Sequence, residues 1–524
     1  MDVIMTKDFV HLHVHTEYSL LDGLSNIKKL FAHVKENNMK AVAITDHGAM
    51  YGAVEFYKEG LKQEVKPIIG MEGYITDLDM KVKPEKATSK NYHLLLLAKN
   101  YEGYKNLMKL NSEAQLYGFY KRPRFDRETL KKYSKGLIVT SACPMGELGQ
   151  AIIEEDNKKV KEIISWYQDV FKDDYYLEIQ RHNFDYYAAQ AKETEIRADL
   201  YNLAKNSDLI NKEVIKLSRD LGVPLVATND AHYIKKEDAP AQDALVCIAT
   251  GKTVPEIKRL RYIDAPAYYL TTPEEMYELF GDVSDSLENT VKIADKCNLE
   301  IETLGKWFFP KFKIETGATP DEELKRLSFE LLPSRVEDTK EARERLDYEL
   351  DIIKAKGYSA YFLIVRDMVN FCNDHGIITN TRGSAAGSLV TYVIGITTVD
   401  PLRYYLPFER FLNPYRPSPP DIDLDIADDK REQLITYITE KYGKEKVAQI
   451  CTFGRMLSRA AVRDVARVLG YPYATGDRIS KLIPPPKQGF PITIPKALLE
   501  VPELKQLYDN DNDSKKVLDM AMEL

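Results

Sequence analysis

The sequence predicts an α/β fold for most of the chain, and three observations support this prediction. Residues 1–280 alternate short β-rich runs with amphipathic helical patterns, which favours a parallel sheet, either open or closed into a barrel. Residues 281–450 combine helical patterns with a stretch, PPDIDLDIADD, whose acidic and apolar residues alternate as in a strand. Residues 451–524 have a mainly helical pattern. We therefore expect three domains with these boundaries.

The first domain shows regular alternation of strand-like and helical segments. Two amphipathic helical patterns, LSNIKKLFAHVKENN and YEGYKNLMKLNSEAQ, lie between the strand-like runs. In chain order those runs are FVHLHVH, AVAITDH, KPIIGMEGYI, YHLLLLAK, GLIVTSAC, DYYLEIQ and VPLVATNDAHY.

Helices begin the second domain and end the third. Thr319, Pro320 and Glu322 match the start of a helix, with threonine as N-cap and glutamate completing a capping box. We expect two further helices at 339–356 and 360–374. The sequence ends in SKKVLDMAMEL, a helical pattern without a Gly or Pro exit signal, which we interpret as a truncation.

The composition indicates a cytoplasmic protein. A net charge of −8 and a pI near 5.8 argue against indiscriminate coating of nucleic acid, but they allow a local basic groove. The five cysteines form no CxxC pair, which favours a reduced compartment. The first ten residues lack the features of a signal peptide, and the longest apolar run, near LVTYVIGIT, is too short to span a bilayer.

Potential metal ligands lie at the ends of the predicted strands in the first domain. The run HLHVHT places His11, His13 and His15 on one face of a strand, and alternate histidines can reach one ion. In a barrel the carboxyl ends of the strands meet at one face, so the other candidates should gather there. They are Asp46, His47, Glu72, His93, Cys143, Asp230 and His232. Local hydrogen bonding of each histidine is the alternative, but it explains so many polar strand ends poorly.

The motifs HLHVHTEYSLLDG, AITDHG, PIIGMEGY and ATNDAHY resemble the PHP (polymerase and histidinol phosphatase) domain. They are similar to the version that opens bacterial DNA polymerase III alpha subunits. The resemblance implies a distorted (β/α)7 barrel with a cluster of up to three Zn²⁺ or Mn²⁺ ions, and Glu72 would bridge two of them. The implied ligands are His13, His15, Asp22, His47, Glu72, His93, Cys143, Asp230 and His232. His11 falls outside this set.

Such a cluster implies metal-assisted phosphoester hydrolysis, because bound ions activate water and neutralise phosphate oxygens. In this family, intact PHP sites are associated with 3′–5′ exonuclease proofreading. The alternative is a bound metal that only stabilises the domain.

Two segments of the second domain resemble the palm of a family C DNA polymerase. The small residues of TRGSAAGSLVTYVIGIT precede an expected helix, where free N–H groups could hold a triphosphate. The second segment, FERFLNPYRPSPPDIDLDI, carries alternate aspartates whose repulsion a cation would neutralise. The resemblance implies a polymerase beta-like α+β palm that binds two Mg²⁺ ions, deoxynucleoside triphosphates and primer–template DNA. In it Asp421 and Asp423 bind metal, Arg382 and Arg410 face the triphosphate, and Gly383 and Ser384 contact its phosphates.

The second domain departs from the family pattern in two ways. The turn reads TNTRGS, whereas the family has Gly-Pro-Gly-Arg-Gly-Ser. No segment before residue 524 matches the family's third catalytic carboxylate. We therefore expect this chain to be the N-terminal part of a polymerase and to synthesise DNA inefficiently by itself. Asp425 is expected not to be a primary ligand.

Four arginines suggest a DNA-binding helix at the start of the third domain, which the resemblance identifies as a mostly helical thumb. Arg455, Arg459, Arg463 and Arg467 repeat every four residues and would form one basic stripe on a helix. A solvated face with Asp464 as local partner is the alternative.

The resemblance implies a replicative DNA polymerase whose complete form also binds the sliding clamp and other replisome subunits, without a membrane. Three alternatives stay open: a stand-alone phosphoesterase or exonuclease, a non-catalytic scaffold, and a different nucleotidyltransferase. Substituting His13 and His15 by alanine should separate the first alternative from the others, because metal-dependent hydrolysis would be lost.

Overall fold

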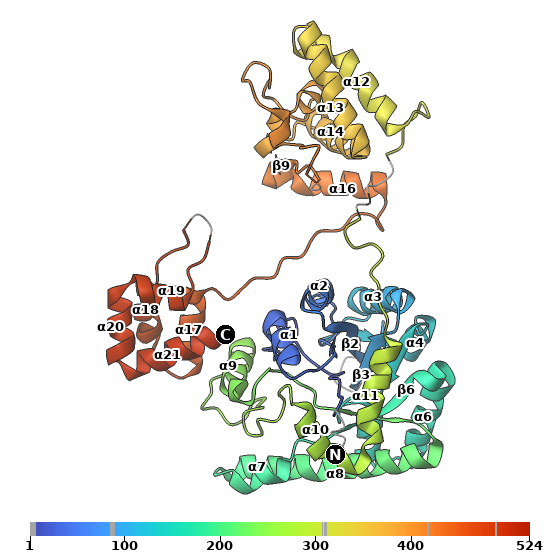
Figure 1. Ribbon diagram of the computed structural model, residues 1–524, viewed down its shortest axis with the longest axis vertical. Helices are drawn as coiled ribbons and strands as arrows, with labels where there is room; N and C mark the ends of the chain where they lie inside the picture. Colours follow the sequence, from blue (N-terminus) through green and yellow to red (C-terminus); the bar gives the residue numbers. More distant parts are fainter. Residues whose placement is uncertain (1–6, 84–89, 307, 309–311, 417–418, 488–489) are drawn as a thin grey trace, which may run out of the picture. The chain divides into compact units, whose positions relative to one another are not determined.

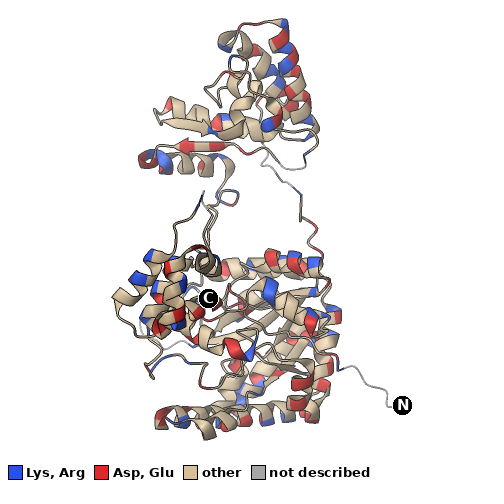
Figure 2. Cartoon of the chain, turned by 60° about the vertical axis from the view of Figure 1, so that its left-hand side comes forward, with Lys and Arg blue, Asp and Glu red and all other residues tan. Residues whose placement is uncertain are grey.

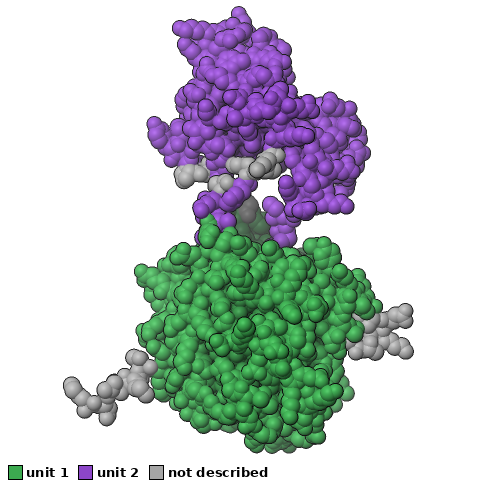
Figure 3. Space-filling view, turned by 90° about the vertical axis from the view of Figure 1, so that its right-hand side faces the viewer, with its two compact units in different colours: residues 1–302, 455–524 green, residues 303–454 purple. Residues whose placement is uncertain are grey.

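The computed structural model describes residues 7–83, 90–306, 308, 312–416, 419–487 and 490–524. The chain forms two compact units, Met1–Glu302 together with Arg455–Leu524, and Thr303–Gly454 (Figure 3). The C-terminal helices therefore belong to the same unit as the N-terminal sheet.

A seven-stranded sheet forms the centre of the first unit, in the order β1-β2-β3-β5-β6-β7 with β4 paired to β2. The pairs β1–β2, β2–β4, β5–β6 and β6–β7 are parallel, but β3 is antiparallel to both of its neighbours. The described residues between β2 and β3 contain no helix, so the chain turns back beside β2 instead of crossing over. The strands are β1 (Ala41–Ile44), β2 (Lys66–Thr76), β3 (Asn91–Ala98), β4 (Arg124–Phe125), β5 (Leu137–Thr140), β6 (Tyr175–Gln180) and β7 (Leu225–Thr228).

The histidine-rich N-terminal segment closes this sheet into a barrel. It forms parallel bridges at both edges, pairing His11 with Val42 of β1 and Val14 with Ala231 beyond β7. The His15 N–H donates to the Ala231 carbonyl oxygen at 2.7 Å. The expected strand FVHLHVH is thus present as isolated bridges rather than as a regular strand. The predicted α/β fold is confirmed.

Helices surround the barrel (Figure 1). One end of the barrel holds an apolar cluster that includes Leu12, Leu97 and Val226 and is covered by Ile293 of α11. The two helices expected from the sequence are present as α1 and α3. The helices of this part are α1 (Ile27–Glu36), α2 (Ala53–Gln63), α3 (Tyr101–Leu116), α4 (Arg127–Lys132), α5 (Glu147–Ile153), α6 (Asn157–Phe171), α7 (Phe184–Gln190), α8 (Thr194–Leu221), α9 (Ala239–Thr250), α10 (Pro273–Phe280) and α11 (Asp285–Lys296).

The C-terminal helices have a core of their own, built from residues such as Val465, Ile479 and Val517. They contact the barrel through α9, where Cys247 packs with Val468 in a small apolar cluster. These helices are α17 (Ser458–Val468), α18 (Tyr473–Leu482), α19 (Ile494–Glu500), α20 (Pro502–Asn510) and α21 (Asn512–Glu523).

The second unit packs helices around Leu346, Phe362, Leu389 and Phe408 and adds a two-stranded antiparallel sheet. The predicted capping box at Thr319 is present, and the two helices expected after it are α13 and α14. The elements are α12 (Pro320–Arg335), α13 (Lys340–Ala355), α14 (Ser359–Asp374), β8 (Thr379–Arg382), α15 (Leu389–Val393), β9 (Asp423–Ile426) and α16 (Arg431–Tyr442).

Charges of both signs are interspersed along the helices of both units (Figure 2). Within the described part of the chain, no helix combines the length and apolarity needed to cross a membrane.

Candidate metal centre and nucleotide site

The nine predicted PHP ligands lie together at one end of the barrel, around the buried carboxylate of Glu72. His47 Nδ1 and His93 Nδ1 lie 2.7 and 2.8 Å from its two oxygens. His13 Nε2 follows at 3.2 Å, His15 Nε2 at 3.6 Å and Cys143 Sγ at 3.7 Å. These side chains come from the N-terminal segment, from β3 and from the loops after β1 and β5, so the barrel itself brings them together.

The remaining three ligands complete the ring of side chains. Asp230 Oδ1 lies 3.2 Å from both His13 Nε2 and His15 Nε2. Asp22 Oδ2 lies 3.6 Å from His47 Nε2 and 3.9 Å from His232 Nε2. Asp230 has a φ of +49°, a left-handed conformation that a non-glycine residue adopts at some energetic cost.

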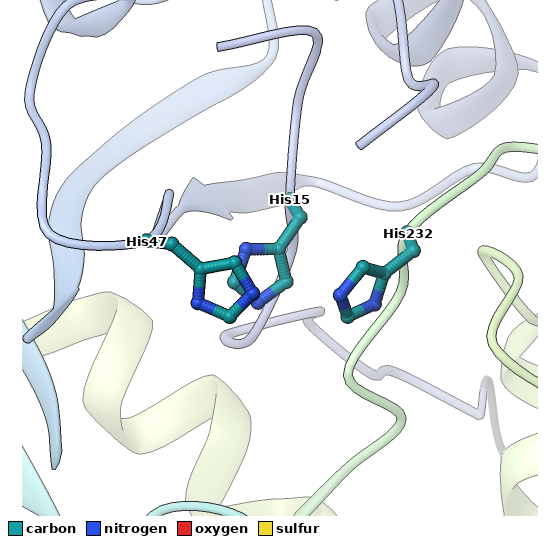
Figure 4. A group of neighbouring side chains, drawn as sticks. All are labelled: His15, His47 and His232. Atoms are coloured by element: carbon teal, nitrogen blue, oxygen red, sulfur yellow. The ribbon is translucent and has the colours of Figure 1, made fainter. Parts of the chain in front are cut away.

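Three overlapping groups have the geometry of metal sites. In each group the ligand atoms lie within 4.8 Å of one another: His15 with His47 and His232, His13 with His15 and Glu72, and His47 with Glu72 and His93. Figure 4 shows the first group, whose imidazole rings face a common space; the His15 ring centroid lies 4.1 Å from that of His47 and 4.3 Å from that of His232. Shared members link the three groups into one cluster.

The donor set fits divalent cations. Among the described residues, buried atoms at this site without a hydrogen-bond partner include His13 Nε2, His15 Nε2 and Glu72 Oε2. Buried polar groups are normally paired, and nitrogen and carboxylate oxygen are ligands of Zn²⁺ and Mn²⁺. Burial, together with the nearby His47 and His232, lowers the pKa of His15 to about 3, which keeps its imidazole neutral as a metal ligand must be.

Two carboxylates outside the nine ligands implied by the resemblance, Glu178 and Asp46, support the ligand histidines. His13 Nδ1 donates to Glu178 Oε1 at 2.8 Å, which leaves Nε2 to face Glu72 and Asp230. Glu178 was missed from the sequence because a single glutamate in a strand carries no motif. Asp46 lies behind Ser19 and accepts a hydrogen bond from its Oγ at 2.8 Å; Ser19 Oγ in turn lies 2.9 Å from His15 Nδ1. Asp46 therefore supports His15 through Ser19 and belongs to none of the three metal groups.

His11 is separate from the cluster. Its Nε2 lies 2.8 Å from the Thr271 carbonyl oxygen, and burial lowers its pKa to about 4. A packing role explains this histidine.

The palm acids lie on and beside β9, in a much more open setting. Asp423 and Asp425 belong to the strand, whereas Asp421 precedes it, so only two of the three alternate aspartates share the strand face. Ile422 and Leu424 pack on the core of this unit, as the alternation predicts. In Figure 2 this strand is red with acidic residues.

The small-residue turn lies against this acidic strand. Arg382 is paired with Asp423 across the sheet, and its Nε lies 2.6 Å from Asp425 Oδ2. Gly383 has a φ of +81°, and a Cβ there would lie 3.6 Å from Asp423 Oδ2. Gly387 approaches the segment before Arg410 so closely that a Cβ would lie 2.8 Å from the Pro407 carbonyl oxygen. The fold therefore brings the predicted nucleotide-binding residues to one place.

A buried glutamate holds this turn and was not expected from the sequence. Glu349 of α13 accepts from Ser388 Oγ at 2.7 Å and from the N–H groups of Leu389 and Val390 at 3.0 Å each. The first turn of α15 is thus already occupied by a carboxylate, so its N–H groups are not free for a triphosphate. Arg345 Nε donates to the same carboxylate at 2.6 Å, and its Nη2 donates to the Gly387 carbonyl oxygen at 3.0 Å. Phosphates would have to use the preceding residues, Gly383 and Ser384.

Comparisons with known proteins agree with both parts. The family model "PHP domain" matches residues 11–182, and "Bacterial DNA polymerase III alpha NTPase domain" matches residues 322–524. The DNA polymerase III subunit alpha of Borreliella burgdorferi is 43% identical over 98% of this chain and 43% of its own length. The proteins of that name from Helicobacter pylori and Campylobacter jejuni are 42% and 39% identical, over 91% and 99% of this chain and 40% and 44% of their own lengths. The chain belongs to the DNA polymerase III alpha family. It spans less than half the length of these relatives.

The predicted basic stripe is only partly a helix face. Arg459, Arg463 and Arg467 lie on α17, but Arg455 precedes that helix. Arg459 donates to the Ile483 carbonyl oxygen at 2.8 Å, and Arg463 donates to Ser480 Oγ at 3.0 Å. These hydrogen bonds hold α17 against α18. The same guanidinium groups would therefore have to keep these bonds, or give them up, when they bind a phosphate.

A cleft of about 700 Å³ opens beside the PHP ligands of this family member. Its lining includes Asp22, His47, His93, Asp230 and His232, together with residues that bind no predicted metal. A molecule in the cleft would therefore contact the metal groups directly.

Proposed function

We propose that this chain is the N-terminal part of a replicative DNA polymerase alpha subunit that carries template-directed synthesis and a metal-dependent 3′–5′ exonuclease. The family membership supports the polymerase assignment. One observation carries the exonuclease assignment: nine ligand side chains converge on a buried site, where atoms such as His13 Nε2, His15 Nε2 and Glu72 Oε2 have no hydrogen-bond partner among the described residues.

In the PHP site, Zn²⁺ or Mn²⁺ ions, up to three in number, would be held by the nine residues around Glu72. When bound, such ions polarise a phosphoester and supply activated water. The chain's own contribution is to fix the donor atoms, because the Glu178 carboxylate orients His13 and Ser19 lies 2.9 Å from His15 Nδ1. The adjoining cleft would hold the end of a DNA strand.

In the palm, Asp421 and Asp423 would hold Mg²⁺, which accepts one or two protein carboxylates and fills its other positions with water and phosphate oxygens. Arg382 and Arg410 would neutralise the triphosphate, whose phosphates would contact Gly383 and Ser384. Arg455, Arg459, Arg463 and Arg467 would contact primer–template DNA. The complete protein would act in the cytoplasm with the sliding clamp and other replisome subunits.

A 5′-labelled primer annealed to a template tests the exonuclease assignment. The chain with Mn²⁺ or Zn²⁺ should shorten the primer from its 3′ end, and a chelator should stop the reaction. Substituting His13 and His15 by alanine should abolish it, whereas Asp421→Asn and Asp423→Asn should leave it unchanged. Absence of shortening by the wild type with either metal would contradict this part of the proposal.

A stand-alone metal-dependent phosphoesterase is the second candidate, and the complete PHP ligand set favours it over a scaffold. That candidate would be supported if the chain hydrolysed small phosphodiesters as fast as it hydrolyses DNA ends.

A further inference from the structure

Asp22 lies in a turn, whereas the ligands Glu72 and His93 lie in the strands β2 and β3. Residues outside the sheet hold it there. Gln242 Nε2 donates to the Asp22 carbonyl oxygen at 3.0 Å, and the Tyr262 hydroxyl donates to Asp22 Oδ2 at 3.4 Å. Asp22 Oδ1 is buried and has no hydrogen-bond partner among the described residues. The position of this ligand therefore depends in part on Gln242 and Tyr262.

A buried ion pair joins the two segments that carry Gln242 and Tyr262. Asp243 follows Gln242 on α9, and its two carboxylate oxygens lie 2.6 and 2.7 Å from the terminal nitrogens of Arg259. The two side chains are 1% and 2% exposed. A buried charge is costly without its partner, so this pair fixes the loop after α9 to the helix.

The same loop contacts the C-terminal helices, and α17 lies beside α9 (Figure 1). The Val254 N–H donates to the carbonyl oxygen of Val468, the last residue of α17, at 2.8 Å. The Val254 carbonyl oxygen accepts from Arg259 Nη2 at 3.1 Å. The Val468 side chain packs with Ala244 and Cys247 of α9. The end of α17 thus contacts both elements that the ion pair joins.

We propose that the segment from Gln242 to Tyr262 links the C-terminal helices to metal binding at Asp22. In this link α17 holds Val254, Arg259 joins the loop to α9, and Gln242 and Tyr262 hold Asp22. None of these residues is a ligand, so they act as positioning residues. Displacement of α17 would therefore lower the affinity of the ion that Asp22 binds. The inference rests on the proposed metal centre and adds a control of that centre by a distant part of the chain.

Two buried valines of the C-terminal helices provide a matched pair of variants. Val468 and Val517 are both 0% exposed, but Val468 packs on α9, whereas Val517 lies in the separate core of the C-terminal helices. Val468→Ala should lower the affinity of one Mn²⁺ ion about fivefold or more, and Val517→Ala should leave it unchanged. Equilibrium dialysis against Mn²⁺ measures both. Wild-type affinity in Val468→Ala, or an equal loss in both variants, would overturn the proposal.

The Tyr262 hydroxyl tests the other end of the link. Tyr262→Phe keeps the ring and should lower the affinity of the same ion about tenfold. Tyr175→Phe is the control, because Tyr175 is also buried and its hydroxyl has no partner among the described residues. If Tyr262 acts through Asp22, Tyr262→Phe should cause no further loss in a chain that already carries Asp22→Asn. A further loss in that double variant would contradict the route through Asp22.

Hydrogen exchange of α17 tests the link in the unaltered chain. Coupling between two sites is reciprocal, so saturation with Mn²⁺ should slow the exchange of α17 amides about fivefold. The slowing should be smaller in Tyr262→Phe than in Tyr175→Phe. Bound Mn²⁺ without any slowing in α17 would overturn the link and leave the metal centre intact. A wild-type chain that binds no Mn²⁺ would overturn both.

Discussion

The two acidic sites of this chain differ in how far the fold prepares them. Around Glu72, which is 1% exposed, the barrel fixes nitrogen and sulfur donors within 4 Å of one carboxylate. On β9, Asp421 and Asp423 are exposed, and Arg382 already pairs with the neighbouring Asp425. The PHP cluster is preorganised, whereas the palm acids lie open on a two-stranded sheet.

The difference follows from the elements that carry the ligands. A closed barrel gathers strand ends from distant parts of the sequence, and buried second-layer carboxylates lock the histidine rings. A two-stranded sheet gives its acids no such support, so incoming metal and phosphates must supply the missing charges. We therefore expect tight metal binding at the first site and weak, substrate-dependent binding at the second.

The largest effect should come from Glu72→Ala. Because this carboxylate belongs to two of the three metal groups, its loss should lower metal affinity and 3′-end hydrolysis by more than about 100-fold, beyond what supporting residues cause. Glu162→Ala on α6, whose side chain is 61% exposed, serves as the control. If Glu72→Ala hydrolysed DNA ends at the wild-type rate, the PHP cluster would not be the preorganised metal site that distinguishes it from the palm acids.

Glu349→Ala should be the most damaging change in the palm. It leaves Arg345 and two N–H groups of α15 without their shared carboxylate, which should destabilise this unit by about 2–4 kcal/mol. Hydrogen exchange of the second unit measures this, with Glu344→Ala on the same helix as control. Exchange that Glu349→Ala does not accelerate would show that the turn does not depend on this residue.

Glu178→Gln sharpens the comparison with a smaller effect. The amide keeps the size of the side chain but removes the charge that holds His13, so metal affinity should fall about 10- to 100-fold. Equilibrium dialysis against Mn²⁺ measures the change. An affinity equal to that of the wild type would mean that the barrel alone orients His13.

Arg382→Ala should have the smallest effect on folding. The side chains of Arg382 and Asp425, which form an ion pair, are 64% and 45% exposed. Exposed ion pairs contribute less than about 1 kcal/mol to the free energy of unfolding. Nucleotide binding should respond more, because the triphosphate would lose a cation. Urea unfolding together with titration of a Mg²⁺–deoxynucleoside triphosphate separates the two roles; a large loss of stability would show that Arg382 is structural.

The sequence carries most of the fold because the periodicity is local. Apart from FVHLHVH, which forms isolated bridges, the strand-like runs and the helical patterns each correspond to an element, and the capping box marks the start of α12 correctly. Three features could not be predicted from single segments. The reversal of β3 depends on the connection after β2, whose described residues contain no helix. Closure by the segment around His13 depends on both sheet edges, and the pairing of β8 with β9 joins distant stretches.

The same distinction applies to the sites. Seven of the nine PHP residues belong to the four quoted motifs, and His93 and Cys143 lie in the strand-like runs YHLLLLAK and GLIVTSAC, so their convergence could be expected. Glu178 and Glu349 act through long-range hydrogen bonds, to His13 and to the start of α15, and nothing in their own segments indicates this. The expected stripe from Arg455 to Arg467 assumed one helix, whereas α17 begins at Ser458. Arg459 and Arg463 bind a carbonyl and a hydroxyl group of neighbouring elements, and Arg467 lies 3.6 Å from Asp464 on its own helix.

The metal content of the purified chain tests the central claim most directly. After dialysis against Mn²⁺ and then against metal-free buffer, elemental analysis should find more than one ion per wild-type chain. Asp423→Asn should retain these ions, and Glu72→Ala should lose them. A wild-type chain without bound ions, or ions that are lost with Asp423 rather than with Glu72, would contradict the account.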